Sequence, residues 1–71
     1  MKVTGDRGTI RIQNDDGTII VGKGDLETTK FYVFSNTLMW QKNGELLTED
    51  ELKIVKEKVN EKDVHNMIEW E

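Results

Sequence analysis

The chain has 71 residues, of which 35% are hydrophobic and 34% are charged, and it contains neither cysteine nor proline. This length suits one domain over residues 1–71, and the absence of cysteine excludes disulfides and thiolate metal sites. The sequence has no apolar run long enough to cross a membrane, and Met1–Gly5 lacks the apolar segment of a signal peptide. We therefore expect a cytoplasmic protein.

Charge is distributed unevenly along the sequence. Residues 1–44 carry a net charge of +1 and residues 45–71 a net charge of −5, which gives −4 for the whole chain. Phosphate-rich partners are bound mainly through Lys and Arg, so this balance disfavours nucleic acid and favours a basic protein partner. The alternative is that the acidic residues only keep a small protein in solution.

The first regular pattern is that of a β-hairpin. Ile10 and Ile12 alternate with polar residues, as expected for a half-buried strand over residues 9–13. Residues 14–17 favour a tight turn, because Asn and Asp hydrogen-bond their own backbone and Gly accepts a positive φ. A second strand is expected over residues 18–21.

The next segments predict two more strands. Residues 22–25 contain two glycines without the spacing of a phosphate-binding loop, so they predict a simple connection. β-Branched and aromatic residues over 28–35 favour a central strand. A tight turn at 35–36 then leads to a fourth strand over 37–41, and an Asn-Gly pair closes it, either as a hairpin turn or as a loop into the next element.

The aromatic residues exceed what one helix can cover. Phe31, Tyr32 and Phe34 alternate between the two faces of a strand, so they cannot all face the same helix. Either sheet curvature and the C-terminal segment bury the surplus, or it forms a partner or dimer interface. Trp40 and Trp70 are likewise either core residues or binding anchors, since Trp is favoured at interface hot spots.

The clearest helix signal begins at Thr48. Thr48 and Glu51 have the spacing of a capping box, and three acidic residues in the first turn complement the helix dipole. An apolar stripe follows at Leu52, Val55 and Val59. We expect a helix over about residues 49–62.

These elements predict an α+β fold, in which an antiparallel β-sheet of four to five strands is covered on one face by a single amphipathic helix. The tail, residues 64–71, fits either a closing strand, with Val64, Ile68 and Trp70 on one face, or a second helix. The polar residues 60–63 before it favour a loop followed by the strand.

Residues suited to catalysis or metal binding are sparse. His65 is the only histidine and Ser35 the only serine, and neither lies in a nucleophile motif. The turn that contains Asp15 and Asp16 lacks the alternating ligands and the distant Glu of a calcium loop. We therefore predict a protein without enzymatic activity, metal site or cofactor.

A binding surface is the remaining expectation. Acidic residues at the hairpin turn and at the helix start suit a basic protein partner, and aromatic residues suit hot spots. The candidate partner-binding residues are Asp15, Asp16, Tyr32, Trp40, Glu49 and Asp50. A homodimer that buries the surplus aromatic residues is a further alternative.

The order of these features resembles a known family. Thr4–Ile10 opens the chain, the aromatic strand ends near Ser35, Leu38–Trp40 follows, and Leu47–Glu51 begins the helix. This order is similar to that of the small bacterial immunity proteins of polymorphic toxin systems, in particular the family numbered seventy-four. The resemblance implies a cytoplasmic protein that protects its producer by binding and blocking a cognate toxin.

The architecture alone is also similar to a coactivator-type fold that binds single-stranded DNA. That resemblance implies a nucleic-acid-binding or transcription-regulatory module that uses its sheet face. The basic and stacking groups on the sheet would be Arg7, Arg11, Lys23, Lys30, Phe31, Tyr32 and Trp40. The net charge of −4 counts against this function.

Overall fold

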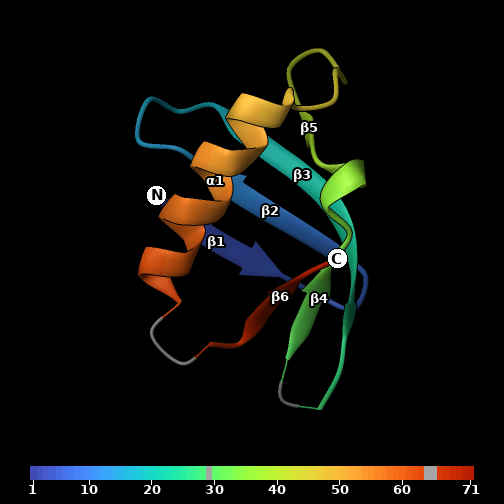
Figure 1. Ribbon diagram of the computed structural model, residues 1–71. Coiled ribbons are helices and arrows are strands. Elements are labelled where there is room, and N and C mark those ends of the chain that lie inside the picture. The colour runs from blue at the N-terminus through green and yellow to red at the C-terminus, as the bar shows by residue number, and fades with distance from the viewer. Residues whose placement is uncertain (29, 64–65) are drawn as a thin grey trace.

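The computed structural model describes residues 1–28, 30–63 and 66–71. These residues form six β-strands, one 3₁₀ turn and one α-helix (Figure 1). In chain order the elements are β1 (Lys2–Gly5), β2 (Thr9–Gln13), β3 (Ile19–Leu26), β4 (Phe31–Val33), the 3₁₀ turn (Ser35–Thr37), β5 (Met39–Trp40), α1 (Glu49–Lys62) and β6 (Ile68–Trp70). The described part of the chain contains no helix that is long and apolar enough to span a membrane.

The strands form one curled sheet in the order β1-β2-β3-β4-β6, and β5 pairs with the first half of β3. Helix α1 crosses one face of this sheet, in front of β1, β2 and β3 in Figure 1. The predicted α+β fold with one helix on one sheet face is therefore confirmed.

The prediction of a purely antiparallel sheet is wrong at one place. β4 and β6 are parallel, with Phe31 opposite Ile68 and Val33 opposite Trp70. Parallel neighbours need a long crossover, which usually contains a helix. Here the crossover contains β5 and α1, and it returns the chain to the end of the sheet at which β4 begins.

The connection expected over residues 22–25 is also wrong, because these residues lie inside β3. A Cβ atom on Gly22 would lie 2.5 Å from the Leu38 side chain. A Cβ atom on Gly24 would lie 2.3 Å from the Tyr32 carbonyl oxygen. The two glycines therefore allow neighbouring segments to approach β3 closely, which is a recognised role of glycine within a strand.

The predicted hairpin is confirmed, with a longer second strand. β2 coincides with the expected strand, and the turn after it contains Gly17 with a φ of 89°. The Asp16 carboxylate accepts hydrogen bonds from the Thr18 backbone N–H at 2.9 Å and from the Thr18 hydroxyl at 2.6 Å. β3 continues to Leu26 instead of ending at residue 21.

The aromatic strand expected over residues 28–35 is shorter, since β4 spans three residues. The chain leaves the sheet at the 3₁₀ turn, where the Thr37 hydroxyl donates to the Phe34 carbonyl oxygen at 2.6 Å and accepts from the Lys23 N–H at 2.9 Å. The strand expected over 37–41 is reduced to the two residues of β5. β1, which the sequence pattern does not predict, pairs along β2.

Alternation along the strands divides side chains between the inner face, under α1, and the outer face. The buried core consists of Ile10, Ile12, Ile20, Val33, Leu38, Val55 and Val59. Phe31, Trp40 and Trp70 pack against this core from its edges, whereas Tyr32 points to the outer face. The inner face therefore takes up Phe31 and the two Trp residues, whereas Tyr32 and Phe34 line a hollow on the outer face.

Helix α1 spans the predicted residues, and its capping box is confirmed. The Thr48 hydroxyl accepts from the Glu51 N–H at 3.2 Å, and the Glu51 carboxylate accepts from the Thr48 N–H at 2.9 Å. Val55 and Val59 are buried, and the half-buried Leu52 packs against them. The apolar stripe therefore faces the sheet as expected.

The closing strand favoured for the tail is present as β6, while Val64 and His65 lie outside the described residues. Trp70 Nε1 donates to Asn60 Oδ1 at 3.0 Å, and Lys56 Nζ lies 5.7 Å from the centre of the Trp70 ring. Both partners belong to α1. Trp70 therefore joins the last strand to the helix.

The close approach at β3 generates a first prediction. Gly24→Ala should lower the free energy of unfolding by about 1–3 kcal/mol, because the added methyl group meets a backbone carbonyl and the Phe31 ring. Urea unfolding followed by tryptophan fluorescence measures this change.

Gly8→Ala is the matched control. Its Cβ atom would lie 3.7 Å from the Gly24 carbonyl oxygen, an ordinary van der Waals contact. Equal unfolding midpoints for Gly24→Ala and Gly8→Ala would refute the packing role of Gly24.

Candidate functional site

Trp40 lies between two hollows that open beside α1. The first has a volume of about 800 Å³ and lies between α1 and the β2–β3 turn. The second, of about 690 Å³, lies between the start of α1 and residues 42–46. Trp40 lines both hollows and is half-buried. The side chain is therefore fixed against the core and still accessible from two sides.

Exposed apolar residues flank Trp40 on both sides. Ile54 lines the first hollow and is 52% exposed, and Leu46 lines the second and is 60% exposed. Ile54 is an apolar residue outside the helical stripe that faces the sheet. Its place in the sequence could therefore have indicated an exposed contact residue, although it is not among the predicted candidates. We call Trp40, Ile19, Leu46 and Ile54, together with the carboxylates of Asp15, Asp16, Glu45 and Glu51 at their rim, the Trp40 surface.

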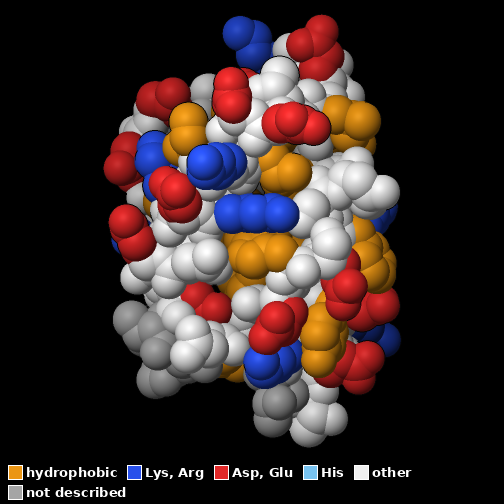
Figure 2. All heavy atoms as spheres, in the orientation of Figure 1, with side chains coloured by type: hydrophobic (Ala, Val, Ile, Leu, Met, Phe, Trp, Pro, Cys, Tyr) orange, Lys and Arg blue, Asp and Glu red, His pale blue; other side chains and the backbone are white. Residues whose placement is uncertain are grey.

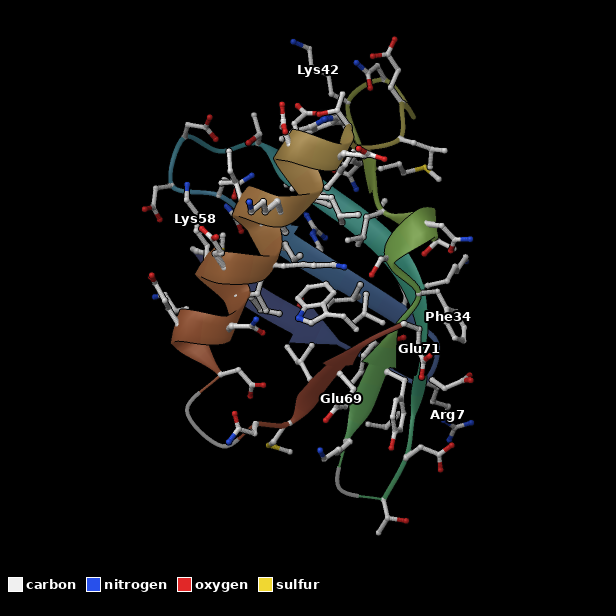
Figure 3. All side chains as sticks on the ribbon, viewed as in Figure 1. Arg7, Phe34, Lys42, Lys58, Glu69 and Glu71 are labelled. Atoms are coloured by element: carbon white, nitrogen blue, oxygen red, sulfur yellow. The ribbon has the colours of Figure 1, made fainter. Side chains whose placement is uncertain are left out.

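Carboxylates outnumber the basic groups around these hollows. Asp15 and Asp16 reach the first hollow from the hairpin turn, and Glu51 lines both hollows. Figure 2 shows acidic side chains gathered at the upper end of the molecule, where α1 begins. The basic residues of the two hollows are Lys42, Lys58 and Lys62, and Figure 3 shows the first two on different elements.

The remaining candidates from the sequence divide between two places. Glu49 and Asp50 are exposed in the first turn of α1, next to the Trp40 surface, although neither lines a hollow. Tyr32 lies on the outer face of β4, opposite Asp25 on β3 and Glu69 on β6. Asp15, Asp16 and Trp40 therefore line one hollow together, whereas Glu49, Asp50 and Tyr32 line neither hollow of the Trp40 surface.

Local contacts lower the pKa values of two acidic groups of the Trp40 surface, Asp15 and Asp16. The amino group of Met1 pairs with the Asp15 carboxylate and lowers the pKa of that carboxyl. Hydrogen bonds from Thr18 lower the pKa of Asp16. Both side chains therefore present negative charge at neutral pH.

Glu51 connects the helix cap to Trp40. The pKa of the Glu51 carboxyl is lowered, mainly by the hydrogen bond from the Thr48 backbone N–H. The Thr48 hydroxyl and the Trp40 indole lower it further. The residue is therefore both a structural cap and part of the candidate surface.

The acidic excess of residues 45–71 does not lie on the helix. Glu49–Lys62 has a net charge of only −1, and Figure 2 shows acidic and basic side chains interspersed over α1. The rest of the excess belongs to Glu45, Asp63, Glu69 and Glu71. Two of these four carboxylates are in or next to β6, beside the acidic residues at the end of β3.

The groups suggested for nucleic-acid binding are divided between the two sheet faces. Arg11 and Lys23 alternate with buried residues and lie on the outer face. Phe31 and Trp40 pack against the core on the inner face. Tyr32, the aromatic residue on the outer face of β4, lies between carboxylates. The basic groups of the outer face therefore share it with Tyr32 and Phe34, whose rings lie beside carboxylates, while Phe31 and Trp40 are not available there for stacking.

The described residues contain no group of three or more His, Asp or Glu side chains placed to hold a metal ion. The Ser35 hydroxyl is buried and, among the described residues, has no hydrogen-bond partner. His65 lies outside the described residues. The absence of enzymatic activity stays a prediction.

Comparisons with protein-family models, with curated proteins and with solved structures find no match to this chain. The resemblance to an immunity-protein family therefore rests on the order of sequence features given above.

The Glu51 contact predicts a pH dependence. Because the pKa of Glu51 is lowered in the folded state, its stabilising effect is present above its ordinary pKa of 4.5 and is lost as the pH falls through the lower folded value. Glu51→Gln should therefore lose less stability than the wild type when the pH falls through this range.

Melting temperatures followed by circular dichroism across the acid range would measure this difference. Asp15 and Asp16 shift in the same direction in both proteins, so the difference between the two curves isolates Glu51. Parallel curves for the wild type and Glu51→Gln would contradict the assignment.

Proposed function

We propose that this chain is a non-catalytic binding protein that neutralises a bacterial toxin by covering a basic surface of it. The protein acts in the cytoplasm of the producing cell. The Trp40 surface makes the central contact, and no chemical step is involved.

The observation that carries this proposal is the arrangement of apolar groups inside an acidic rim. Leu46 and Ile54, 60% and 52% exposed, flank the half-buried Trp40. Exposed apolar residues that lie together favour a protein interface, and a Trp fixed at the centre of such a patch is a typical hot spot. A fixed anchor loses little side-chain entropy on binding.

The charge of the rim supports the choice of partner. Asp15, Asp16 and Glu51 face the same hollow and are ionised at neutral pH, as carboxylates with pKa values lowered from their ordinary values are. A basic cleft, such as that of a toxin that attacks nucleic acid, is electrostatically complementary to this rim. Complementary charge accelerates association and excludes wrong partners.

Growth rescue is the direct test. We expect a toxic domain to be encoded beside the gene for this chain. That domain should arrest growth when expressed alone, and co-expression of this chain should restore growth. Leu46→Lys combined with Ile54→Lys should weaken binding about a hundredfold, because apolar contact is lost and like charges meet. Calorimetry with the purified domain measures the affinity.

The matched control places the same change at the opposite end of the sheet. Leu26 and Met67 are 59% and 50% exposed and lie outside the Trp40 surface. Leu26→Lys combined with Met67→Lys should preserve rescue. Failure of the wild type to rescue growth would reject the proposed function. Equal rescue by both double variants would reject the proposed surface.

A titration with single-stranded DNA tests the alternative function. The divided basic and aromatic groups predict no saturable binding at low salt. Saturable binding that weakens steeply as salt is added would instead favour a nucleic-acid-binding module.

A further inference from the structure

The outer face of the sheet carries a third hollow, away from the Trp40 surface. It has a volume of about 540 Å³ and lies over the end of β3, over β4 and next to β6. We call it the Tyr32 hollow. Its lining includes Asp25, Glu27, Tyr32, Phe34 and Glu71. None of these residues lines either hollow of the Trp40 surface.

Two aromatic side chains give this hollow accessible ring surface. Tyr32 points outward from β4 and is half-buried, and Phe34 follows two residues later, also half-buried. Figure 3 shows Phe34 and Glu71 on the flank of the sheet that points away from α1. Helix α1, which covers the inner face, therefore does not cover these rings.

Carboxylates surround the rings because three strands meet here. The register places Asp25 and Glu69 directly opposite Tyr32, one on each side. Glu27 lies two residues after Asp25, and Glu71 lies two residues after Glu69; both line the hollow. Asp25 and Glu27 are more than forty residues away in the sequence from Glu69 and Glu71. The cluster therefore forms only in the folded sheet.

Little internal positive charge compensates these carboxylates. Lys30 also lines the hollow, but its ammonium group pairs with the Glu69 carboxylate. Among the described residues, the carboxylates of Asp25, Glu27 and Glu71 make no ion pair. The hollow therefore keeps an excess of negative charge beside two aromatic rings.

We propose that the Tyr32 hollow is a second docking surface, which binds a basic segment of a partner protein through a Lys or Arg side chain. The cation would lie against the Tyr32 ring and between the carboxylates of Asp25 and Glu71. Aromatic rings attract cations through their quadrupole, and carboxylates add charge complementarity. This inference rests on the outer face alone and does not depend on the Trp40 surface.

The chemistry of the hollow favours this occupant over others. Nucleic acid and other phosphate-bearing molecules would meet uncompensated carboxylates. A second copy of the chain that packed face to face would present Arg11 and Lys23 to the hollow, since both lie on the same outer face as the hollow itself. Such a face-to-face pair is distinguished by the experiment below.

The test uses a short capped peptide in which arginine alternates with threonine, and a matched peptide with neutral citrulline in place of each arginine. Backbone amide shifts of the intact ¹⁵N-labelled protein locate the binding. The arginine peptide should shift the amides of Asp25, Tyr32, Phe34 and Glu71, and the citrulline peptide should leave them unchanged.

Two variants test the chemistry of the hollow. Asp25→Asn combined with Glu71→Gln should reduce the affinity for the arginine peptide about tenfold, since two charges are lost with little change in shape. Tyr32→Leu keeps an apolar side chain without the ring and should reduce the affinity about two- to fivefold. Unchanged spectra elsewhere would establish that both variants fold.

The control removes two charges at the other surface. Glu49→Gln combined with Asp50→Asn should leave the affinity for the arginine peptide within about twofold, because these residues lie outside the hollow. An equal loss in this control would show general attraction between charges and would overturn the proposal. Equal binding of the citrulline peptide would also overturn it. So would concentration-dependent shifts of the same amides without peptide, which would identify a second copy as the occupant.

Discussion

The close approach of two neighbouring segments to β3 is the contact on which the rest of the structure depends. At Gly22 and Gly24 the inner side of this strand has no side chain, so Leu38 and the Phe31 ring occupy that space. At the same point β3 changes its partner from β5 to β4. Both candidate surfaces therefore belong to one strand, with Ile19 at one end and Asp25 near the other.

The sequence predicted correctly those elements that are stabilised by interactions between residues close in the chain. The hairpin turn around Gly17 and the capping box at Thr48 each satisfy their hydrogen bonds within a few residues, and both occur where the pattern indicated. The glycines of β3 were predicted to form a connection because the contacts that require glycine there are made with residues distant in the sequence. The parallel pairing of β6 was missed for the same kind of reason, since the helix that makes it possible was treated only as a cover for the sheet.

For the candidate surfaces, too, the sequence identifies residues, but pairing between distant strands decides which of them lie together. The sequence supplied Trp40 and the acidic turn residues, but it grouped them with Tyr32, which the sheet places on the other face. Net charge by sequence segment assigned the acid to the helical half. The register instead places Glu69 and Asp25, two residues from different halves of the chain, on either side of Tyr32. Net charge summed over a sequence segment therefore does not locate the carboxylates on the folded surface.

The parallel ladder between β4 and β6 also has a consequence for the order of folding. Its paired residues, such as Phe31 and Ile68, are separated by most of the second half of the chain, whereas β2 and β3 are joined by a short turn. Closing the longer loop costs more entropy, so we expect the hairpin to form early and β6 to dock late. A partner that binds next to β6 would then distinguish completely folded molecules from those in which only the hairpin and helix have assembled.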